Sequence, residues 1–452
     1  MEKGRNADLT QGPIAKQLIR FALPLLAGSL IQQLYSTVDM MFVGRVLGSE
    51  AAAAVGSSGM IVTCIIGFFT GLSVGISVAV GKAFGGNDSE KLNRYIHTAA
   101  ALTLLMAAVF TVLGLLLAPT LHQWMDVPAK ILSQATAYIR LYLLGLVSVV
   151  SYNVGTGILK ALGNSTAPML YQLIGGLANV LGNAVFICVL DWGIVGAALA
   201  TVCTQSLAAA LTICHLFRLP QSIRLKIKRI RLDWKTILEI LAVGIPAAVQ
   251  AIVVSLSNAI VQSHINRLGV AEIAAFTAYY KVENILYYPI MAIGQSCSAF
   301  VSQNIGAGKL SRAKQGTRTS LLLGTGVTAT LTAMTLAGVR VLFGFFSTDQ
   351  QVIELGAKIA WVAYPFYFLY VFLEVYAASV RGAGKAMPGM VITVVNMCFV
   401  RICILKLVLR FAPSITGVAA VYPLTWASTA ACMYLYYRSG RWQPQQLKSE
   451  VL

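Results

Sequence analysis

Five ionisable side chains lie inside long apolar stretches of this sequence, where a charge is unusual. Asp39, Glu283 and Glu374 are carboxylates in such stretches, and Lys281 and Arg401 are cations in them. A charge among apolar groups is costly unless it meets a partner or a water-filled cavity. A carboxylate in that setting can exchange a proton or attract a cation. These five residues are therefore the first candidates for chemistry.

Asp39 has polar residues at helical spacing around it. Tyr35 precedes it by one turn and shares its helix face, and Asn179 and Asn183 are four residues apart, so both amides project to one side of a helix. Asp39 can therefore bind and release a proton, or it can make a simple hydrogen bond between helices. The two asparagines can serve the same site or hold helices together.

The remaining charged candidates have two interpretations each. Lys281 and Glu283 are two residues apart and face different sides of their helix, which favours a structural ion network with other helices. Glu374 either faces a cavity and attracts a cationic substrate, or forms a structural pair with Arg401 or Lys281.

Tyr280, Tyr287 and Tyr367 stand in segments dense in aromatic residues. Such rings suit flat, lipophilic cations, with ordinary core packing as the alternative. We take Glu374, Glu283, Tyr280, Tyr287 and Tyr367 as candidate substrate-binding residues.

The elements that carry these residues are membrane spans. Of 452 residues 57% are hydrophobic and 11% charged, with a mean hydropathy of +0.75, whereas soluble domains carry about 25% charged residues. Runs that are apolar on every face predict helices rather than barrel strands. Twelve apolar blocks are present: 15–42, 54–80, 96–118, 134–159, 167–190, 193–216, 237–264, 274–302, 317–346, 354–380, 388–410 and 414–437.

The charge distribution predicts orientation. The net charge is +18, but the basic residues cluster in alternate gaps between blocks, as in loops facing an anionic cytoplasmic leaflet. We therefore expect a multi-pass protein of the cell inner membrane with both termini cytoplasmic and no nucleic-acid partner. The eight cysteines lie inside apolar blocks without CxxC spacing, which predicts buried thiols and no metal site.

The two halves of the chain match at a shift of 220 to 222 residues. Pro24 corresponds to Pro246, and the segments KALGNSTAP and VRGAGKAMP correspond as well. Each half holds six spans, so we expect two six-helix bundles related by a pseudo-two-fold axis along the membrane normal. The predicted domains are 1–217, a basic cytoplasmic linker at 218–235, a second bundle at 236–438, and a cytoplasmic tail at 439–452. The linker either only holds topology or also binds lipid at the membrane surface.

This organisation indicates a secondary transporter in which the two bundles rock around a central site. The chain has no GxxxxGK[ST] phosphate loop, so ATP is not its fuel. Its four histidines are dispersed, which argues against a membrane-embedded enzyme. A channel would leave the repeat unexplained.

The helix with Pro24, Asp39 and VGRVLG, the QNIGAGK loop, the paired KALGN and RGAGK segments, and the repeat resemble the multidrug and toxic compound extrusion (MATE) family, closest to its DinF-like bacterial branch. The resemblance covers almost the whole chain. It implies antiport of organic cations or drugs against protons or sodium ions. A lipid or lipid-linked oligosaccharide flippase of the same superfamily is the alternative.

The resemblance also implies a cation-coupling site. In the family an aspartate and a tyrosine of the first helix combine with two asparagines or aspartates of the fifth helix and a threonine of the sixth. Asp39, Tyr35, Asn179, Asn183 and Thr201 match these positions. Some members carry aspartate where Asn183 stands, and the single carboxylate here disfavours a tightly bound sodium ion. We expect no cofactor or metal, a small cationic substrate, lipids as surroundings, and a monomer.

Overall fold

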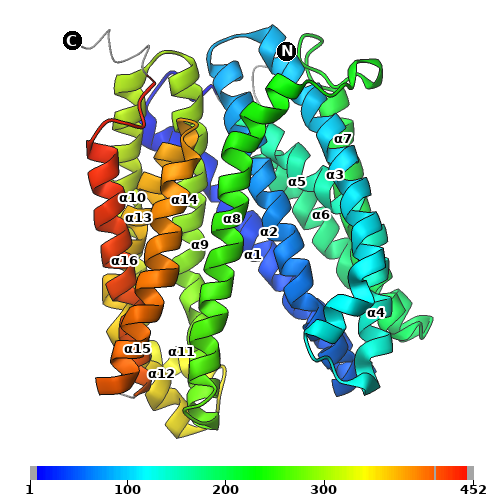
Figure 1. Ribbon diagram of the computed structural model, residues 1–452, viewed down its shortest axis with the longest axis vertical. Coiled ribbons are helices and arrows are strands. Elements are labelled where there is room, and N and C mark those ends of the chain that lie inside the picture. The colour runs from blue at the N-terminus through cyan, green and yellow to red at the C-terminus, as the bar shows by residue number, and fades with distance from the viewer. Residues whose placement is uncertain (1–7, 412–413, 445–452) are drawn as a thin grey trace. The chain divides into compact units, whose positions relative to one another are not determined.

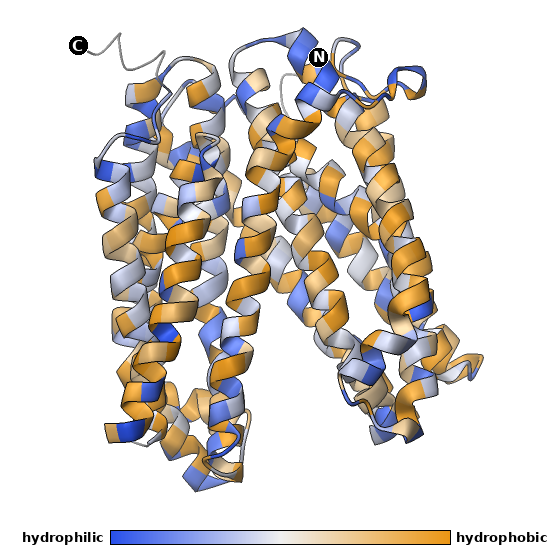
Figure 2. Ribbon diagram, in the orientation of Figure 1, coloured by the Kyte–Doolittle hydropathy of each residue, from blue (hydrophilic) through white to orange (hydrophobic). Residues whose placement is uncertain are grey.

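All regular structure in the described part of the chain is helical. The computed structural model describes residues 8–411 and 414–444, and Figure 1 shows helices throughout these ranges. Eleven helices are long and apolar enough to cross a membrane, and α4 and α5 form a further pair bent by 49°. Counting that pair as one span gives the twelve that the sequence predicts. Figure 2 shows hydrophobic residues along the helices and hydrophilic ones near their ends. The predicted all-α membrane fold is confirmed.

The described residues form two compact units. Among the described residues, unit 1 comprises residues 8 and 27–248, and unit 2 comprises residues 9–26, 249–411 and 414–444. The first half of the chain contains α1 (Ile14–Phe42), η1 (Val43–Leu47), α2 (Ser49–Gly85), α3 (Ser89–Trp124), α4 (Ala129–Leu144), α5 (Leu146–Ala161), α6 (Thr166–Asn183), η2 (Ala184–Val189), α7 (Gly193–Phe217) and η3 (Ile227–Arg229). The second half contains α8 (Trp234–Ile265), α9 (Val270–Gly306), α10 (Leu310–Ala337), α11 (Val339–Gly344), α12 (Gln350–Ala363), η4 (Tyr364–Phe366), α13 (Tyr367–Gly382), α14 (Ala386–Val394), η5 (Val395–Val400), α15 (Arg401–Phe411) and α16 (Ile415–Arg438).

The boundaries of the units differ from the predicted domain boundaries. They fall inside α1 and α8, so each unit contains the first half of the helix that opens the other repeat. Both crossings come two residues after the equivalent prolines, Pro24 and Pro246. Proline removes one backbone hydrogen bond from a helix, which makes these positions the natural places for a bend.

The first half of α8 packs against α2 in unit 1 without room for side chains between the backbones. A Cβ on Gly71 would lie 2.3 Å from the backbone nitrogen of Ala248, and one on Gly75 would lie 2.4 Å from the carbonyl oxygen of Ile240. Small residues allow such close approach between membrane helices. The two glycines therefore fix the position of the exchanged half-helix.

The first half of α1 is held in unit 2 by polar contacts. Ser296 Oγ of α9 donates a hydrogen bond to the carbonyl oxygen of Leu18 at 3.1 Å. Before the helix, Arg312 Nη2 donates to the carbonyl oxygen of Gly12 at 2.8 Å and to Gln17 Oε1 at 3.0 Å. The first half of α1 thus belongs to unit 2, and the first half of α8 belongs to unit 1.

The prediction that the cysteine thiols are buried is wrong for most of them. Among the described residues Cys297 alone is buried, and five of the others are exposed on apolar helices. A small apolar side chain is equally suited to a surface that meets lipid. Of the predicted tail, residues 445–452 lie outside the described residues.

Candidate functional site

Asp39 and the asparagine pair meet in unit 1. Asn183 Nδ2 of α6 donates a hydrogen bond to Asp39 Oδ1 of α1 at 2.7 Å and is also 3.2 Å from Asn179 Oδ1. Both asparagines are buried, and Asp39 is partly buried. The geometry brings together three of the five residues predicted for the coupling site, because their spacing places the two amides on the α6 face that meets α1.

Asn183 retains a buried oxygen without a hydrogen-bond partner among the described residues. An unpaired buried acceptor is unfavourable unless a donor or a cation reaches it. The carboxylate of Asp39 and this amide oxygen are therefore two oxygens suited to share a proton or a metal cation.

Tyr35 lies beside this cluster and is joined to it by a residue that the sequence reasoning missed. Gln172 Nε2 donates to the Tyr35 hydroxyl oxygen at 3.2 Å. The Tyr35 ring packs on Gly176, and a Cβ on that glycine would lie 3.2 Å from Tyr35 Cδ1. Gln172 precedes Asn179 by seven residues, about two helical turns, so the same spacing argument could have identified it.

Thr201 is the fifth predicted residue of the coupling site. Its hydroxyl donates to the carbonyl oxygen of Ala197 in its own helix at 3.2 Å. The side chain is partly buried, and the hydrogen bonds of the described residues do not join it to Asp39. Its role at the site stays a prediction.

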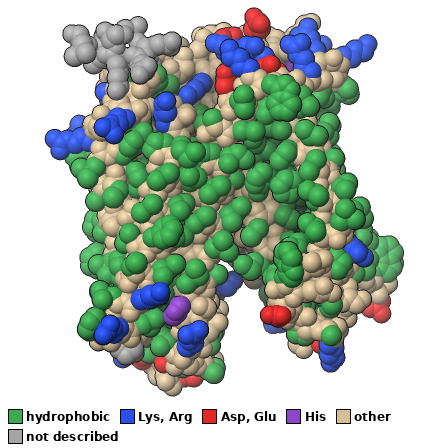
Figure 3. Space-filling view, viewed as in Figure 1, with side chains coloured by type: hydrophobic (Ala, Val, Ile, Leu, Met, Phe, Trp, Pro, Cys, Tyr) green, Lys and Arg blue, Asp and Glu red, His purple; other side chains and the backbone are tan. Residues whose placement is uncertain are grey.

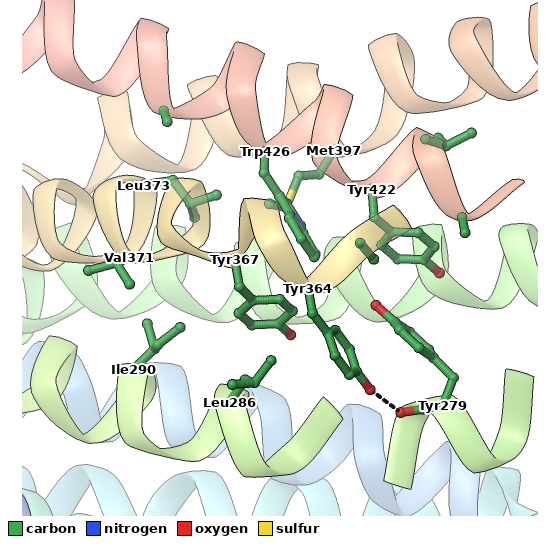
Figure 4. Close-up of a cluster of buried hydrophobic side chains, with 14 of the residues drawn as sticks. Tyr279, Leu286, Ile290, Tyr364, Tyr367, Val371, Leu373, Met397, Tyr422 and Trp426 are labelled. Carbon is green, nitrogen blue, oxygen red and sulfur yellow. Dashed lines mark hydrogen bonds between the residues drawn. The ribbon is translucent and has the colours of Figure 1, made fainter. Parts of the chain in front are cut away.

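In unit 2 the candidates Glu283 and Tyr367 lie in a tyrosine cage completed by Tyr279 and Tyr364, which are not among the candidates. Tyr367 and Tyr279 donate to Glu283 Oε1 at 2.7 and 3.3 Å. Figure 4 shows Tyr279, Tyr364 and Tyr367 directed toward one another, with the Tyr364 hydroxyl bonded to the carbonyl oxygen of Tyr279 at 3.2 Å. Tyr367 is only 1% exposed, so packing and polar contact occur together here.

Arg401 is buried opposite this cage and is held by neutral groups. It is 2% exposed, and its guanidinium donates to Asn258 Oδ1 at 2.8 Å and stacks 5.0 Å from the centre of the Tyr422 ring. The Tyr422 hydroxyl is 2.6 Å from that of Tyr280. No salt bridge joins Arg401 to Glu283 among the described residues.

The suggested partners of Glu374 are wrong. Its Oε1 accepts a charge-assisted hydrogen bond from Arg381 Nη2 at 3.1 Å, with side-chain exposures of 6% and 14%. Seven residues separate the two, so both lie on one face of α13. Lys281 is exposed and outside every ion pair of the described residues, which also contradicts its predicted place in an ion network.

Tyr287 contacts Tyr370 in the same unit, with ring centres 5.8 Å apart. It is partly buried and lies between the Glu283 cage and the Glu374 pair along α9 and α13. The described residues contain no group of three or more His, Cys, Asp or Glu that could hold a metal ion.

Comparison with known families decides the classification. The MatE family model matches residues 24–185 and 246–405, one match in each repeat. The chain belongs to the MatE family. Like its relatives in that family it is a multi-pass membrane transporter and not an enzyme.

The relatives have more than one described cargo. The chain is 26% identical over 444 residues to the probable multidrug resistance protein YpnP of Bacillus subtilis, with 98% of this chain and 99% of the relative covered. It is also 26% identical over 453 residues to an FAD transporter of Shewanella oneidensis, covering 95% and 96%. Neither relative is described as a flippase, so that alternative is not favoured.

The fold agrees with solved MATE structures. A crystal structure of MATE in the bent conformation matches with a TM-score of 0.91 over 98% of each chain, at 21% identity. That similarity extends over both repeats. At this identity it supports the fold alone.

Proposed function

We propose that this MatE-family transporter exports organic cations or drugs in exchange for protons, by alternating access, with Asp39 as the proton carrier. The observation that carries the proposal is the hydrogen bond from buried Asn183 to Asp39, beside an amide oxygen that lacks a donor. The remaining acidic residues of unit 1 lie outside its helices or in the first six residues of one, as Glu239 does in α8. Asp39 is eight residues from the end of the span Ile14–Leu47.

The amide and the carboxyl group suit both protonation states. An ionised Asp39 accepts the N–H of Asn183. A protonated Asp39 can in addition donate its O–H to an amide oxygen, and the unpaired Asn183 oxygen is such an acceptor. A carboxylic acid and a primary amide can pair through two hydrogen bonds, with the amide N–H donating to the acid and the acid O–H donating to the amide oxygen. Protonation of Asp39 would therefore keep the existing bond from Asn183 and give the Asn183 oxygen a donor. Asn179 and Tyr35 would hold the amide face in place.

Sodium is the less favoured coupling ion. A sodium ion needs several oxygen ligands, and this site offers one carboxylate with neutral amide and hydroxyl groups. Asn179, Asn183 and Thr201 could supply such oxygens, which makes sodium an explicit outcome of the transport test.

Cation binding is proposed for the tyrosine cage of unit 2. Glu283 supplies a negative charge without a direct ion pair, Tyr367 of the cage supplies an aromatic face, and Tyr280 and Tyr287 supply further rings beside the cage. Glu374 is neutralised by Arg381, so it would attract a substrate only if that pair opened. Flat organic cations combine the charge and apolar surface that such a cage favours.

Alternating access is supported by the repeat and by the exchange of helix halves. Motion of one unit relative to the other would bend α1 and α8 near Pro24 and Pro246, where a helical hydrogen bond is already missing. We propose that both termini are cytoplasmic, that the protein lies in the cell inner membrane, and that one chain suffices for transport.

The experiment uses purified protein in liposomes loaded with a fluorescent organic cation. We expect an imposed pH gradient to drive dye across the membrane in sodium-free buffer. Transport driven only by a sodium gradient would show that sodium, and not the proton, is the coupling ion. Movement of a lipid-linked sugar without any response to dye would contradict the export proposal.

A further inference from the structure

The basic linker between α7 and α8 is fixed on the beginning of α3. The backbone N–H of Lys226 donates to His97 Nε2 at 2.9 Å, and Asn93 Nδ2 donates to the carbonyl oxygen of Ser222 at 3.1 Å. His97 Nδ1 lies 2.7 Å from the carbonyl oxygen of Asn93. Because Nε2 accepts the hydrogen bond from Lys226, Nδ1 is the ring nitrogen left to donate to the Asn93 carbonyl oxygen. The linker is therefore held in a defined conformation on the surface of unit 1.

A basic cavity of about 550 Å³ opens between this linker and α3. Arg94 of α3 and Lys228, Arg229 and Arg231 of the linker line it, together with Glu90. Four basic and one acidic side chain give a lining charge of 4 − 1 = +3. None of the four basic groups lies within 4.0 Å of a carboxylate among the described residues. Basic side chains also gather at this end of unit 1 on the face in Figure 3.

Two acidic residues flank the cavity but are engaged elsewhere. Asp88 caps α3 by accepting the N–H of Lys91 at 3.0 Å, and this bond holds the pKa of Asp88 below its usual range. Asp233 accepts hydrogen bonds from the hydroxyl and N–H of Thr236, which lower the pKa of Asp233. Both carboxylates cap helix starts. Arg94 acts on both at longer range and Arg231 acts on Asp233, but no ion pair joins them among the described residues, so these guanidinium groups keep their hydrogen-bond donors for a further anion.

An apolar groove of about 160 Å³ adjoins the same two segments. Leu225 and Ile230 of the linker and Ile96, Ala100 and Leu104 of α3 are among its lining residues. Ile96 and Ile230 line the groove, and their sequence neighbours His97, Arg229 and Arg231 line the cavity. The groove and the cavity are therefore adjacent.

Exposed apolar side chains on and next to the linker indicate a membrane interface. Ile227 of the linker and Trp234, the first residue of α8, are each 72% exposed. An exposed tryptophan next to basic residues is typical of the headgroup level of a bilayer.

We propose that the linker and α3 form a binding site for an anionic phospholipid. Its phosphate would lie in the cavity among Arg94, Arg229 and Arg231, and an acyl chain would follow the groove along Ile96 and Ala100. A phosphate headgroup matches arginine donors that have no carboxylate partner. The groove favours a lipid over a free phosphate, because a soluble anion would use the cavity alone. This site is separate from Asp39 and does not depend on the proposed export activity.

The test compares lipid binding to the purified full-length protein in detergent, measured by native mass spectrometry. Phosphatidylglycerol is the anionic probe, phosphatidylcholine is the neutral one, and inorganic phosphate is the soluble competitor. We expect preferential retention of phosphatidylglycerol. The variant R94Q/R229Q/R231Q should weaken its binding at least about tenfold, since each basic group near an anionic headgroup is worth several-fold in affinity.

A matched control removes charge from the same region without touching the cavity. Arg218, Arg224 and Lys235 lie within the predicted linker 218–235 and do not line the cavity. The variant R218Q/R224Q/K235Q removes three charges, as the cavity variant does, and should retain phosphatidylglycerol like the wild type. Ala100→Phe should fill the groove and weaken lipid binding while all four basic groups remain. Unchanged thermal unfolding of each variant verifies that it is folded.

Three outcomes would overturn the proposal. Equal retention of phosphatidylcholine and phosphatidylglycerol would exclude headgroup selectivity. Equal loss in the control and the cavity variants would assign the effect to net charge. Full competition by millimolar inorganic phosphate, with no effect of Ala100→Phe, would make the cavity a soluble-anion site.

Discussion

Unit 1 and unit 2 share an order of helices but differ in their interiors. The polar centre of unit 1 is one carboxylate, Asp39, bonded to Asn183. Unit 2 instead contains the tyrosine cage of Glu283, the buried Arg401 and the pair of Glu374 with Arg381. The repeat therefore preserves the scaffold and leaves the chemistry of each interior free to diverge.

The repeat register makes the difference explicit. A shift of 222 residues, which relates Pro24 to Pro246, places Val261 opposite Asp39. Val261 is 1% exposed and packs in the hydrophobic core of unit 2. The equivalent position in unit 2 therefore has no titratable side chain, so the proposed proton carrier has no counterpart there.

The largest effect should follow from Asp39→Asn. The amide keeps the shape and hydrogen-bonding capacity of the side chain but cannot be ionised, so dye accumulation driven by a pH gradient should fall to the background of empty liposomes. Cation binding should persist, because the tyrosine cage belongs to unit 2. Glu283→Gln is the comparison, and it should weaken dye binding while leaving residual proton-driven transport. Loss of coupling in Glu283→Gln with retention in Asp39→Asn would reverse the assignment of the two units.

Arg381→Gln should cause the largest loss of stability. It leaves the buried Glu374 carboxylate without its cation, and removal of one partner of a buried pair costs about 3–5 kcal/mol. We expect a clear decrease in the midpoint of thermal unfolding in detergent. The double variant E374Q/R381Q should recover much of that loss, since it removes both charges. A double variant as unstable as Arg381→Gln would show that the pair is not the cause.

Gly71→Ala should loosen the exchanged half of α8 in unit 1. Its Cβ would lie 2.3 Å from the backbone of Ala248, so the helices must separate, at a cost of about 1–3 kcal/mol as for other overpacked sites. Gly59→Ala, in the same helix, meets nothing within 4 Å and should leave the unfolding midpoint unchanged or slightly higher. Equal effects of the two substitutions would mean that the close packing does not position α8.

The smallest predicted effect is that of Tyr367→Phe. The change removes one hydrogen bond to Glu283 and keeps the ring, so we expect dye affinity to change by roughly twofold to tenfold, the net contribution of one ordinary hydrogen bond. Equilibrium dye binding by fluorescence anisotropy measures it. Phe276→Leu controls for packing, because the Phe276 ring packs on Tyr279 of the cage and carries no hydroxyl. An equal change in that control would assign the effect to ring packing rather than to the bond.

The sequence predicts the fold well because the lengths of the apolar stretches and the match between the two halves can be read directly along the chain. The shared face of Asn179 and Asn183 follows from helical spacing, and Gln172 could have been found in the same way, whereas the grouping of these asparagines with Asp39 comes from the resemblance to the MATE family. The exchange of α1 and α8 between units depends on which distant surfaces pack, so no local pattern reveals it. The neutral partners of Arg401 are likewise distant in the chain, with Asn258 separated from it by 143 residues.

The most direct test of the account measures proton movement itself. Liposomes containing the protein and an internal pH indicator are given an outward or inward gradient of organic cation in sodium-free buffer, with the membrane potential clamped. The account predicts that the cation gradient drives protons in the opposite direction in the wild type and that Asp39→Asn abolishes this flux. Proton movement that is unchanged in Asp39→Asn, or that requires sodium in the wild type, would contradict the central claim that Asp39 carries the coupling proton.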